Sequence, residues 1–382
     1  MFRLAERGKK MSSVQYYRPT KISINLKAIQ QNIRNLQQHL TAGVQIIAVV
    51  KANAYGHGDV EVARTALQEG ATTLAVATFE EALHIREHFK EAQILVLGIV
   101  LPQFVNDAIA NDIILTAPSL QWLEQVMKHK SSGNIRVHLK IDSGMGRIGI
   151  RDKEEMKAVA TFTQCEGIEV DGIFTHFATA DEQDEAYFLQ QAKAFSTMVA
   201  FLPKKPRLIH VANTATALIK SKAYQFNAVR YGIAMYGLAA SPYVEACAPF
   251  ALEPALSLHS ALTHVKQIEA GDHIGYGATF TAKKRMFIGT LPIGYADGLL
   301  RGLAGQEVLI DGQRMPIVGN ICMDQCMVAM NKNYPIGEPV TLIGTQQNTT
   351  INIDEWAERL NTINYEIPCT LSYRVPRIHK ND

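Results

Sequence analysis

Eight short apolar runs alternate with segments of helical periodicity between residues 45 and 237. The runs are QIIAVVK (45–51), TLAVAT (73–78), QILVLGI (93–99), DIILTA (112–117), IRVHLKID (135–142), IEVDGIFTHF (168–177), RLIHVAN (207–213) and NAVRYGIAMYG (227–237). Between them, segments such as VEVARTALQEG and YFLQQAKAFSTMVAFL repeat apolar residues every three or four positions, which is typical of amphipathic helices. Eight strand-then-helix units in succession predict an α/β fold, namely a (β/α)8 barrel.

The pattern changes after residue 240 to closely spaced runs rich in β-forming residues. Runs such as RMFIGTLPIGY, QEVLIDGQRMPIVG and PVTLIG are separated by Gly and Asp turns. We therefore expect an N-terminal barrel domain over residues 1–240 and a β-rich C-terminal domain over residues 241–382. Residues 1–20 are expected to form an N-terminal extension, and Met11 is an alternative start.

Two short patterns predict how strands pair. Asp311 and Gly312 lie between apolar runs, and this dipeptide favours a two-residue hairpin. The run ISINL (22–26) precedes the first barrel strand and alternates with a period of two. We expect it to pair with the C-terminal domain.

The composition excludes several classes of protein. The chain has 382 residues, of which 47% are hydrophobic and 19% charged, and this balance is typical of a globular protein. Its 38 basic and 36 acidic residues give a net charge of +2 without a basic run, so nucleic acid is not an expected partner. No run approaches the ~20 apolar residues of a membrane span, so no membrane association is expected. An odd count of five cysteines and the lack of a secretory signal predict a cytoplasmic protein.

Lys51 ends the first apolar run, at the edge of the barrel where enzymes of this fold place their chemistry. Burial there would lower the pKa of the amine, and a neutral amine forms a Schiff base with an aldehyde cofactor. The segments ANTAT (212–216) and RYGIAMYG (230–237) follow the last two strands and can present backbone N–H groups to a phosphate. Spacing alone leaves open a solvated lysine and two tight turns without a ligand.

Three motifs have the spacing of ligand sites but are not assigned to them. GMGRIG (144–149) matches a dinucleotide-binding loop, yet Arg147 would occupy the place where the backbone must approach a pyrophosphate. HIREH (84–88) matches an inverted zinc-peptidase motif, but without a downstream acidic ligand it is interpreted as two surface histidines. Cys322 and Cys326 lack the second pair of a zinc site. No metal site is predicted.

Nine segments taken together resemble the alanine racemase family. They are AVVKANAYGHG, KIDSGMGRIG, THFATAD, HVANTAT, AVRYGIAMYG, GYGATF, PIGYADG, GNICMDQ and CTLSYRVPR. The similarity extends from about residue 19 to Arg377. The resemblance implies an isomerase that binds pyridoxal 5'-phosphate, acts on alanine and forms a homodimer with shared active sites.

The resemblance also implies roles for residues of the barrel. Lys51 is the implied Schiff-base lysine, and Arg147 is the implied contact of the cofactor's phenolic oxygen and of the substrate carboxylate. Arg230 would face the pyridine nitrogen, and His176 would lie near the ring. The implied phosphate contacts are Tyr55, Thr214, Gly232 and Ile233. Lys140, a supporting residue, occupies a position that is often carbamylated in relatives.

Further roles fall in the C-terminal domain. The residues that would serve the partner's active site are Tyr276, Tyr295 and Met323, the last at the substrate. Asp324 follows as a supporting residue, and Tyr373 is an implied cofactor contact. Asn320 replaces an arginine that some relatives carry near the substrate entrance, which leaves the shape of that entrance open.

The implied reaction interconverts L- and D-alanine through an external aldimine and needs a base on each face of the reacting carbon. Lys51 is expected on the D-alanine face and the partner's Tyr276 on the L-alanine face. The product D-alanine would supply peptidoglycan synthesis. The alternatives are a racemase that also accepts serine, a barrel-type amino-acid decarboxylase and a non-catalytic carrier of the cofactor.

Overall fold

The structure is a computed structural model that describes residues 16–381. Contacts divide the chain into two compact units. The barrel unit is built on Ser23–Leu256, together with Asn361–Leu371 and residues 379–381. The β-rich unit is built on Ser257–Leu360, together with Ser372–Ile378 and residues 16–22. The predicted boundary at residue 240 stays a prediction, and most of the predicted extension, with Met11, lies outside the described residues.

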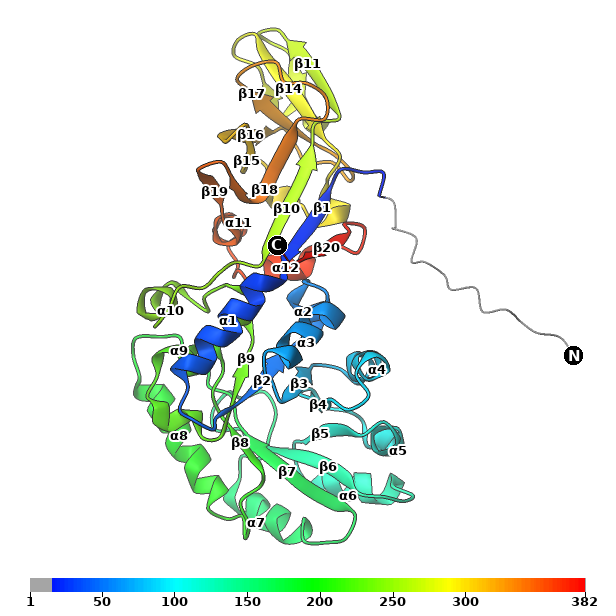
Figure 1. Ribbon diagram of the computed structural model, residues 1–382, viewed down its shortest axis with the longest axis vertical. Coiled ribbons are helices and arrows are strands. Elements are labelled where there is room, and N and C mark those ends of the chain that lie inside the picture. The colour runs from blue at the N-terminus through cyan, green and yellow to red at the C-terminus, as the bar shows by residue number, and fades with distance from the viewer. Residues whose placement is uncertain (1–15, 382) are drawn as a thin grey trace, which may run out of the picture. The chain divides into compact units, whose positions relative to one another are not determined.

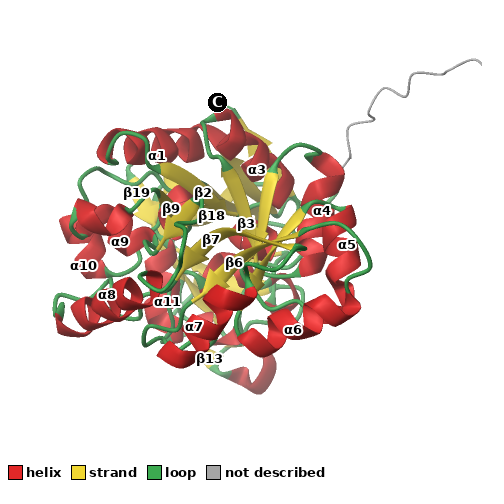
Figure 2. Cartoon of the chain, turned by 90° about the horizontal axis from the view of Figure 1, so that it is seen from below, coloured by secondary structure: helices red, strands yellow, loops and turns green. Residues whose placement is uncertain are grey.

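Eight parallel strands form one sheet in the barrel unit, in the order β8-β7-β6-β5-β4-β3-β2-β9. They are β2 (Gln45–Val49), β3 (Thr73–Val76), β4 (Gln93–Val96), β5 (Ile113–Ala117), β6 (Ile135–Lys140), β7 (Ile168–Phe174), β8 (Leu208–His210) and β9 (Ala228–Tyr231). The N–H of Arg230 on β9 donates to the carbonyl of Ala212, just after β8, at 3.0 Å, so the two ends of the sheet meet. Figure 2 shows the strands at the centre and the helices around them. The predicted (β/α)8 barrel is confirmed.

Most residues of the barrel strands are apolar because both faces of the sheet are covered. Every residue of β3 and of β5 is buried. In a parallel barrel one face packs against the interior and the other against helices. This explains why the sequence shows continuous apolar runs here and no alternation.

Helices follow the strands, and most of them lie outside the barrel (Figure 1). They are α1 (Leu26–His39), α2 (Lys51–Tyr55), α3 (Asp59–Gln68), α4 (Phe79–His88), α5 (Val105–Ala110), α6 (Leu120–His129), α7 (Lys153–Phe162), α8 (Ala186–Val199), α9 (Thr214–Ile219), α10 (Pro242–Cys247) and α12 (Glu366–Thr370). Polar residues cap the first turns of several of these helices: the Thr78 side chain accepts from the N–H of Glu81, and that of Ser119 accepts from the N–H of Trp122. Within residues 16–381, no helix has both the length and the apolar character needed to cross a membrane.

The second sheet has the strand order β11-β14-β17-β16-β15-β18-β10-β1-β20, with β19 paired to β18. Its strands are β1 (Lys21–Asn25), β10 (Leu256–Ala261), β11 (His264–Ile268), β14 (Met286–Leu291), β15 (Glu307–Ile310), β16 (Gln313–Val318), β17 (Cys326–Met330), β18 (Pro339–Gln346), β19 (Thr349–Ile351) and β20 (Arg377–Lys380). A two-stranded sheet of β12 (His273–Ile274) and β13 (Phe280–Thr281) and the helix α11 (Ile353–Leu360) complete the β-rich unit. The predicted β-rich domain is confirmed.

Both predicted strand pairings are present. Ile310 pairs with Gln313, so Asp311 and Gly312 form a two-residue hairpin turn. Both turn residues have a positive φ, 51° and 71°, which this kind of turn requires. The strand β1, which contains most of the ISINL segment, lies between β10 and β20.

Candidate active site

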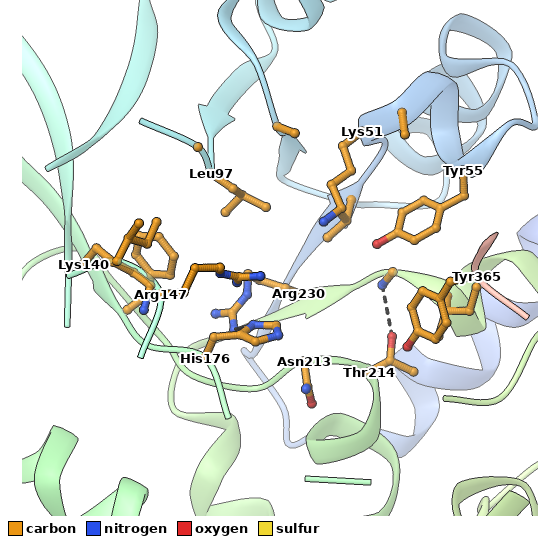
Figure 3. Close-up of a pocket in the computed structure, with 18 of the residues that line it drawn as sticks. Lys51, Tyr55, Leu97, Lys140, Arg147, His176, Asn213, Thr214, Arg230 and Tyr365 are labelled. Atoms are coloured by element: carbon orange, nitrogen blue, oxygen red, sulfur yellow. Dashed lines mark hydrogen bonds between the residues drawn. The ribbon is translucent and has the colours of Figure 1, made fainter. Parts of the chain in front are cut away.

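A cavity of about 610 Å³ lies at the carboxyl ends of the barrel strands. Polar side chains from successive strand ends line it, and they are Lys51 after β2, Lys140 at the end of β6, His176 after β7, Thr214 after β8 and Arg230 on β9. Figure 3 shows these side chains around one common space, together with Arg147, Tyr55 and Tyr365. Because the strands come from distant parts of the sequence, only the closed barrel brings these groups together.

The chain makes a left-handed turn directly after Lys51. Residues 52–55 have φ angles of 51–52°, a conformation that costs an L-residue other than glycine roughly 1–2 kcal/mol. The Glu81 carboxylate holds the start of the turn, because it accepts a hydrogen bond of 2.7 Å from the N–H of Ala52. Strain of this kind concentrates at functional sites. Here the turn brings Lys51 and Tyr55 to the same cavity.

Replacing Ala52 by glycine is expected to stabilise the protein. Glycine adopts a positive φ without steric cost, and the exposed Ala52 side chain contributes little packing. The relief of strain should exceed the entropy cost of glycine, so we expect the free energy of unfolding to rise by about 0.5–1 kcal/mol. Ala52→Val should lower it, because a β-branched side chain is more restricted. Denaturant unfolding of the three proteins tests this, and equal stabilities would contradict a strained turn.

Arg147 is carried by a glycine-rich loop that folds back on the end of β6. The Asp142 carboxylate accepts hydrogen bonds from the N–H groups of Gly144 and Gly146 at 3.1 and 2.9 Å. A Cβ atom at Gly149 would lie 2.6 Å from the backbone nitrogen of Asp142, so only glycine fits there. The glycines of the GMGRIG motif therefore build a turn that brings Arg147 to the cavity.

One end of the cavity is shaped for a small anion. The N–H of Gly232 donates to the Thr214 hydroxyl at 3.2 Å, as the dashed line in Figure 3 marks. A Cβ atom on Gly232 would lie 3.0 Å from the Tyr55 hydroxyl oxygen, so any larger residue would fill this end. Ile233 and Tyr365 complete the lining. Hydroxyl and backbone N–H donors around such a space suit a phosphate.

Arg230 is held firmly and keeps one N–H for the cavity. Its Nη1 donates to the carbonyl and to Nδ1 of His210 at 2.7 and 3.0 Å, and its Nη2 donates to the carbonyls of Thr175 and Val211 at 2.9 Å each. Nη2 also lies 3.3 Å from Nδ1 of His176. The remaining N–H, on Nε, has no acceptor among the described residues and is not sealed in the interior. This N–H can donate a hydrogen bond to an unprotonated nitrogen in the aromatic ring of a ligand.

Four basic side chains line the cavity, and within the described chain no carboxylate does. They are Lys51, Lys140, Arg147 and Arg230. Burial and then the nearby Arg147 lower the pKa of Lys51, and the same two causes lower the pKa of Arg230 to about 9. Burial and then Arg230 lower the pKa of His176 well below its ordinary value. The cavity therefore favours an anionic ligand and a neutral Lys51 amine.

Lys140 should make the stability of the cofactor-free protein depend on pH. Burial and then Arg230 lower its pKa from 10.5 to about 7 on folding. Between these values the unfolded chain binds the extra proton, so the free energy of unfolding rises with pH, by up to about 1.4 kcal/mol per pH unit. Chemical unfolding at about pH 7 and pH 9 measures the slope. Lys140→Met should have a shallower slope, and identical slopes would contradict the assignment.

Both parts of the chain match one family. Residues 24–240 match the alanine racemase N-terminal domain, and residues 255–379 match the alanine racemase C-terminal domain. The chain belongs to the alanine racemase family. It is 48% identical to alanine racemase 1 of Bacillus subtilis over 369 residues, which cover 96% of this chain and 95% of the relative. It is 50% identical to the alanine racemase of Geobacillus kaustophilus, with 95% of each chain covered.

A solved structure of a family member has the same architecture. The alanine racemase of Bacillus anthracis with bound L-Ala-P superposes with a TM-score of 0.93 at 45% identity, and 96% of each chain is covered. Alanine racemases are isomerases that depend on pyridoxal 5'-phosphate. The two enzymatic alternatives, a serine-accepting racemase and a decarboxylase, gain no support from these relatives.

The structure of this alanine racemase family member brings together every barrel residue to which the resemblance gave a role. The cavity lining contains Lys51, Tyr55, Lys140, Arg147, His176, Thr214, Arg230, Gly232 and Ile233. It also contains Tyr365 and Cys369, which the sequence analysis missed. Both belong to a short segment after the β-rich domain that returns to the barrel unit, and no spacing rule connects it with a barrel.

The residues expected to serve a partner lie on loops of the β-rich unit. Tyr276 is 74% exposed, Met323 is 53% exposed and Tyr295 is 40% exposed. Hydrogen bonds join these loops: the Asn320 side chain donates to the Tyr276 carbonyl at 2.7 Å, and the N–H of Ala296 donates to the Met323 carbonyl at 3.0 Å. Three large side chains are thus presented to solvent from neighbouring loops.

Two further predicted site residues also belong to the β-rich unit. Asp324 forms an ion pair of 2.7 Å with Arg374. Tyr373 is 94% exposed, and its expected contact with the cofactor stays a prediction. Within the barrel unit, two tyrosines line the cavity, the predicted Tyr55 and the unpredicted Tyr365.

The histidines of the HIREH motif are exposed on α4. His84 Nε2 lies 3.6 Å from the carboxylate of Asp59, and His88 Nδ1 lies 3.0 Å from the His84 carbonyl. Cys322 and Cys326 are free thiols, and the latter is buried. Neither motif contributes to the cavity lining.

Proposed function

We propose that this chain interconverts L- and D-alanine with pyridoxal 5'-phosphate as its cofactor. The observation that carries the proposal is the Lys51 amine in a cavity lined by basic side chains and, among the described residues, by no carboxylate. When bound, the cofactor withdraws electrons from the amino acid and makes its Cα proton acidic. A cavity of about 610 Å³ is of the size typical for a small-molecule site.

The barrel residues fit this cofactor group by group. Lys51, whose lowered pKa favours the neutral amine, would hold it covalently. Tyr55, Thr214 and the backbone of Gly232 and Ile233 would bind the phosphate. The Gly232 N–H, which donates to the Thr214 hydroxyl at 3.2 Å, would then donate to a phosphate oxygen. The Nε–H of Arg230 would donate to the ring nitrogen and keep it unprotonated, because an arginine rarely gives up its proton.

Racemisation needs a base on each face of the reacting carbon. Lys51, once the substrate amine has released it, would move the proton on the D-alanine face. Tyr276 of the partner subunit would do so on the L-alanine face. Arg147 would bind the substrate carboxylate, and Met323 of the partner subunit would border it.

A homodimer with shared sites would explain the exposed loops of the β-rich unit. Tyr276, Tyr295 and Met323 are large, partly apolar side chains, and such groups are enriched in protein interfaces. A dimer would cover them and complete each cavity with residues from the second chain.

The reaction would take place in the cytoplasm. All five cysteines are free, which fits a reducing cytoplasm. There the enzyme would supply D-alanine for peptidoglycan.

Proton NMR of L-alanine in D2O tests the reaction type. With the cofactor-loaded protein we expect the Cα–H signal to vanish while the total amount of alanine stays constant, because each turnover replaces this proton by solvent deuterium. A decarboxylase would convert alanine into ethylamine, and a non-catalytic carrier would leave the spectrum unchanged. Either of these two results would contradict the proposed function.

A further inference from the structure

Two histidines lie inside the barrel and have no part in the proposed function. His138 on β6 and His210 on β8 are fully buried, and their ring centroids are 5.0 Å apart. Neither lines the cavity, although His210 stacks on the cavity residue Phe174 with 4.8 Å between ring centroids. A buried imidazole costs free energy unless its nitrogens are hydrogen-bonded. The hydrogen-bond partners of His138 and His210 therefore indicate what the two side chains do.

The two rings form the middle of a hydrogen-bonded chain. At the cavity, Arg230 Nη1 lies 3.0 Å from Nδ1 of His210. Nε2 of His210 then lies 2.8 Å from Nδ1 of His138. Nε2 of His138 lies 3.0 Å from Oδ2 of Asp171. Asp171 also accepts two hydrogen bonds of 2.7 Å from Arg207, whose side chain is 44% exposed.

Both ends of this chain fix the direction of its hydrogen bonds. An arginine N–H can only donate and an ionised carboxylate can only accept. Nδ1 of His210 must therefore accept from Arg230, so the proton of this ring is on Nε2 and is donated to His138. The proton of His138 is then on Nε2 and is donated to Asp171. Each hydrogen bond then has one donor and one acceptor. This arrangement is possible only if both rings are neutral.

The ionisation of the groups agrees with this direction. Burial lowers the pKa of His138 and, further, that of His210, so both rings are neutral at neutral pH. Burial opposes the charge of Asp171, but hydrogen bonds from His138 and Arg207 hold its pKa well below the ordinary value. The carboxylate is thus ionised and able to accept.

Arg230 is a buried cation that no carboxylate contacts within residues 16–381. Only 4% of it is exposed, and its partners are backbone carbonyls and imidazole nitrogens. The acidic group to which it is connected is Asp171, at the far end of the two rings. A chain of polarised hydrogen bonds in a low-dielectric interior strengthens each of its links.

We propose that Asp171 is the remote counter-charge of Arg230, and that neutral His138 and His210 transmit its influence and fix the orientation of the guanidinium. Asp171, His138 and His210 are positioning residues, because they act on the ligand only through Arg230. The part that concerns a cofactor ring rests on the proposed function. The positions of the protons on His138 and His210 do not depend on the proposed function.

Nitrogen NMR of the cofactor-loaded wild-type protein, labelled with ¹⁵N-histidine, tests the arrangement directly. For both rings we expect a protonated Nε2 and an unprotonated Nδ1 at neutral pH, with a coupling between Nε2 of His210 and Nδ1 of His138 across their hydrogen bond. His138→Gln and His210→Gln assign the signals. A proton on Nδ1 of either ring, or a doubly protonated ring, would overturn the proposal whether or not the protein racemises alanine.

Asp171→Asn removes the charge and nearly keeps the shape. Because Arg207 offers only donors, the new carbonyl would turn toward it and the new NH2 group toward His138 Nε2. The proton of His138 should then no longer be confined to Nε2. Turnover should fall by about tenfold or more, as is typical when an outer partner of a functional side chain is lost.

Glu169→Gln is the matched control, because it makes the same change of charge at an exposed position of the same strand, β7. It should leave the histidine signals and the turnover unchanged. If Asp171→Asn also leaves both unchanged, Asp171 is not the counter-charge of Arg230. If that variant does not fold, the wild-type spectrum still decides.

Discussion

Replacing Lys51 by alanine is expected to reduce alanine racemisation by about 10³-fold or more and to abolish covalent attachment of the cofactor. Lys51 combines two roles, as the attachment point and as one of the two bases, so both are lost together. The other lysine of the cavity is not placed to replace it, because Lys140 is buried and donates to the Ile141 carbonyl at 2.7 Å. Visible absorbance and the protein mass after borohydride reduction measure attachment.

Lys157→Ala is the control for this substitution. Lys157 is an exposed lysine on α7 that forms an ion pair of 2.7 Å with Glu154 and does not line the cavity. Its loss should change neither turnover nor attachment of the cofactor. A small external amine should restore part of the turnover of Lys51→Ala, since it supplies the missing base. Retention of both absorbance and activity by Lys51→Ala would show that another group holds the cofactor.

Tyr276→Phe is expected to slow racemisation by about 10²-fold or more, which is typical for the loss of a positioned base. In a shared site, this variant and Lys51→Ala damage each cavity from different chains. Mixed dimers of the two inactive variants then contain one cavity with both Lys51 and Tyr276 intact. Equal amounts that exchange subunits freely should recover about a quarter of the wild-type activity, because half of the dimers are mixed and each has one complete site.

A cavity served by a single chain would give the opposite result in the mixing experiment. If Lys51 and Tyr276 served a cavity within one chain, no mixed dimer would contain a complete site and activity would stay at the level of the separate variants. Tyr373→Phe is a useful companion, because Tyr373 is also an exposed tyrosine of the β-rich unit. If it loses activity alone and complements Lys51→Ala, Tyr373 serves the partner's cavity; loss of activity without complementation would place it in the cavity of its own chain.

The barrel could be predicted from the sequence because burial on both faces makes its strands visible as apolar runs. β3 and β5 are buried at every position, and helices of ordinary length separate such strands. The hairpin at Asp311 and Gly312 was equally accessible, since few dipeptides tolerate two positive φ angles. In these places local chemistry and the final fold agree.

Other features depend on contacts that no local pattern records. The left-handed turn at residues 52–55 contains no glycine, and its conformation persists because neighbours such as Glu81 hold it. Tyr365 reaches the cavity only because its segment returns to the barrel after the β-rich domain. His138 lies between Val137 and Leu139 on β6 and His210 ends β8, and only the folded barrel brings their ring nitrogens to 2.8 Å.

Chiral chromatography of alanine tests the central claim most directly. Purified protein loaded with pyridoxal 5'-phosphate is incubated separately with L-alanine and with D-alanine, and both enantiomers are followed until they no longer change. The proposed function predicts that both reactions converge on the same, nearly equal mixture of L- and D-alanine. If both alanines stay enantiomerically pure while the cofactor remains attached to Lys51, the chain is not an alanine racemase.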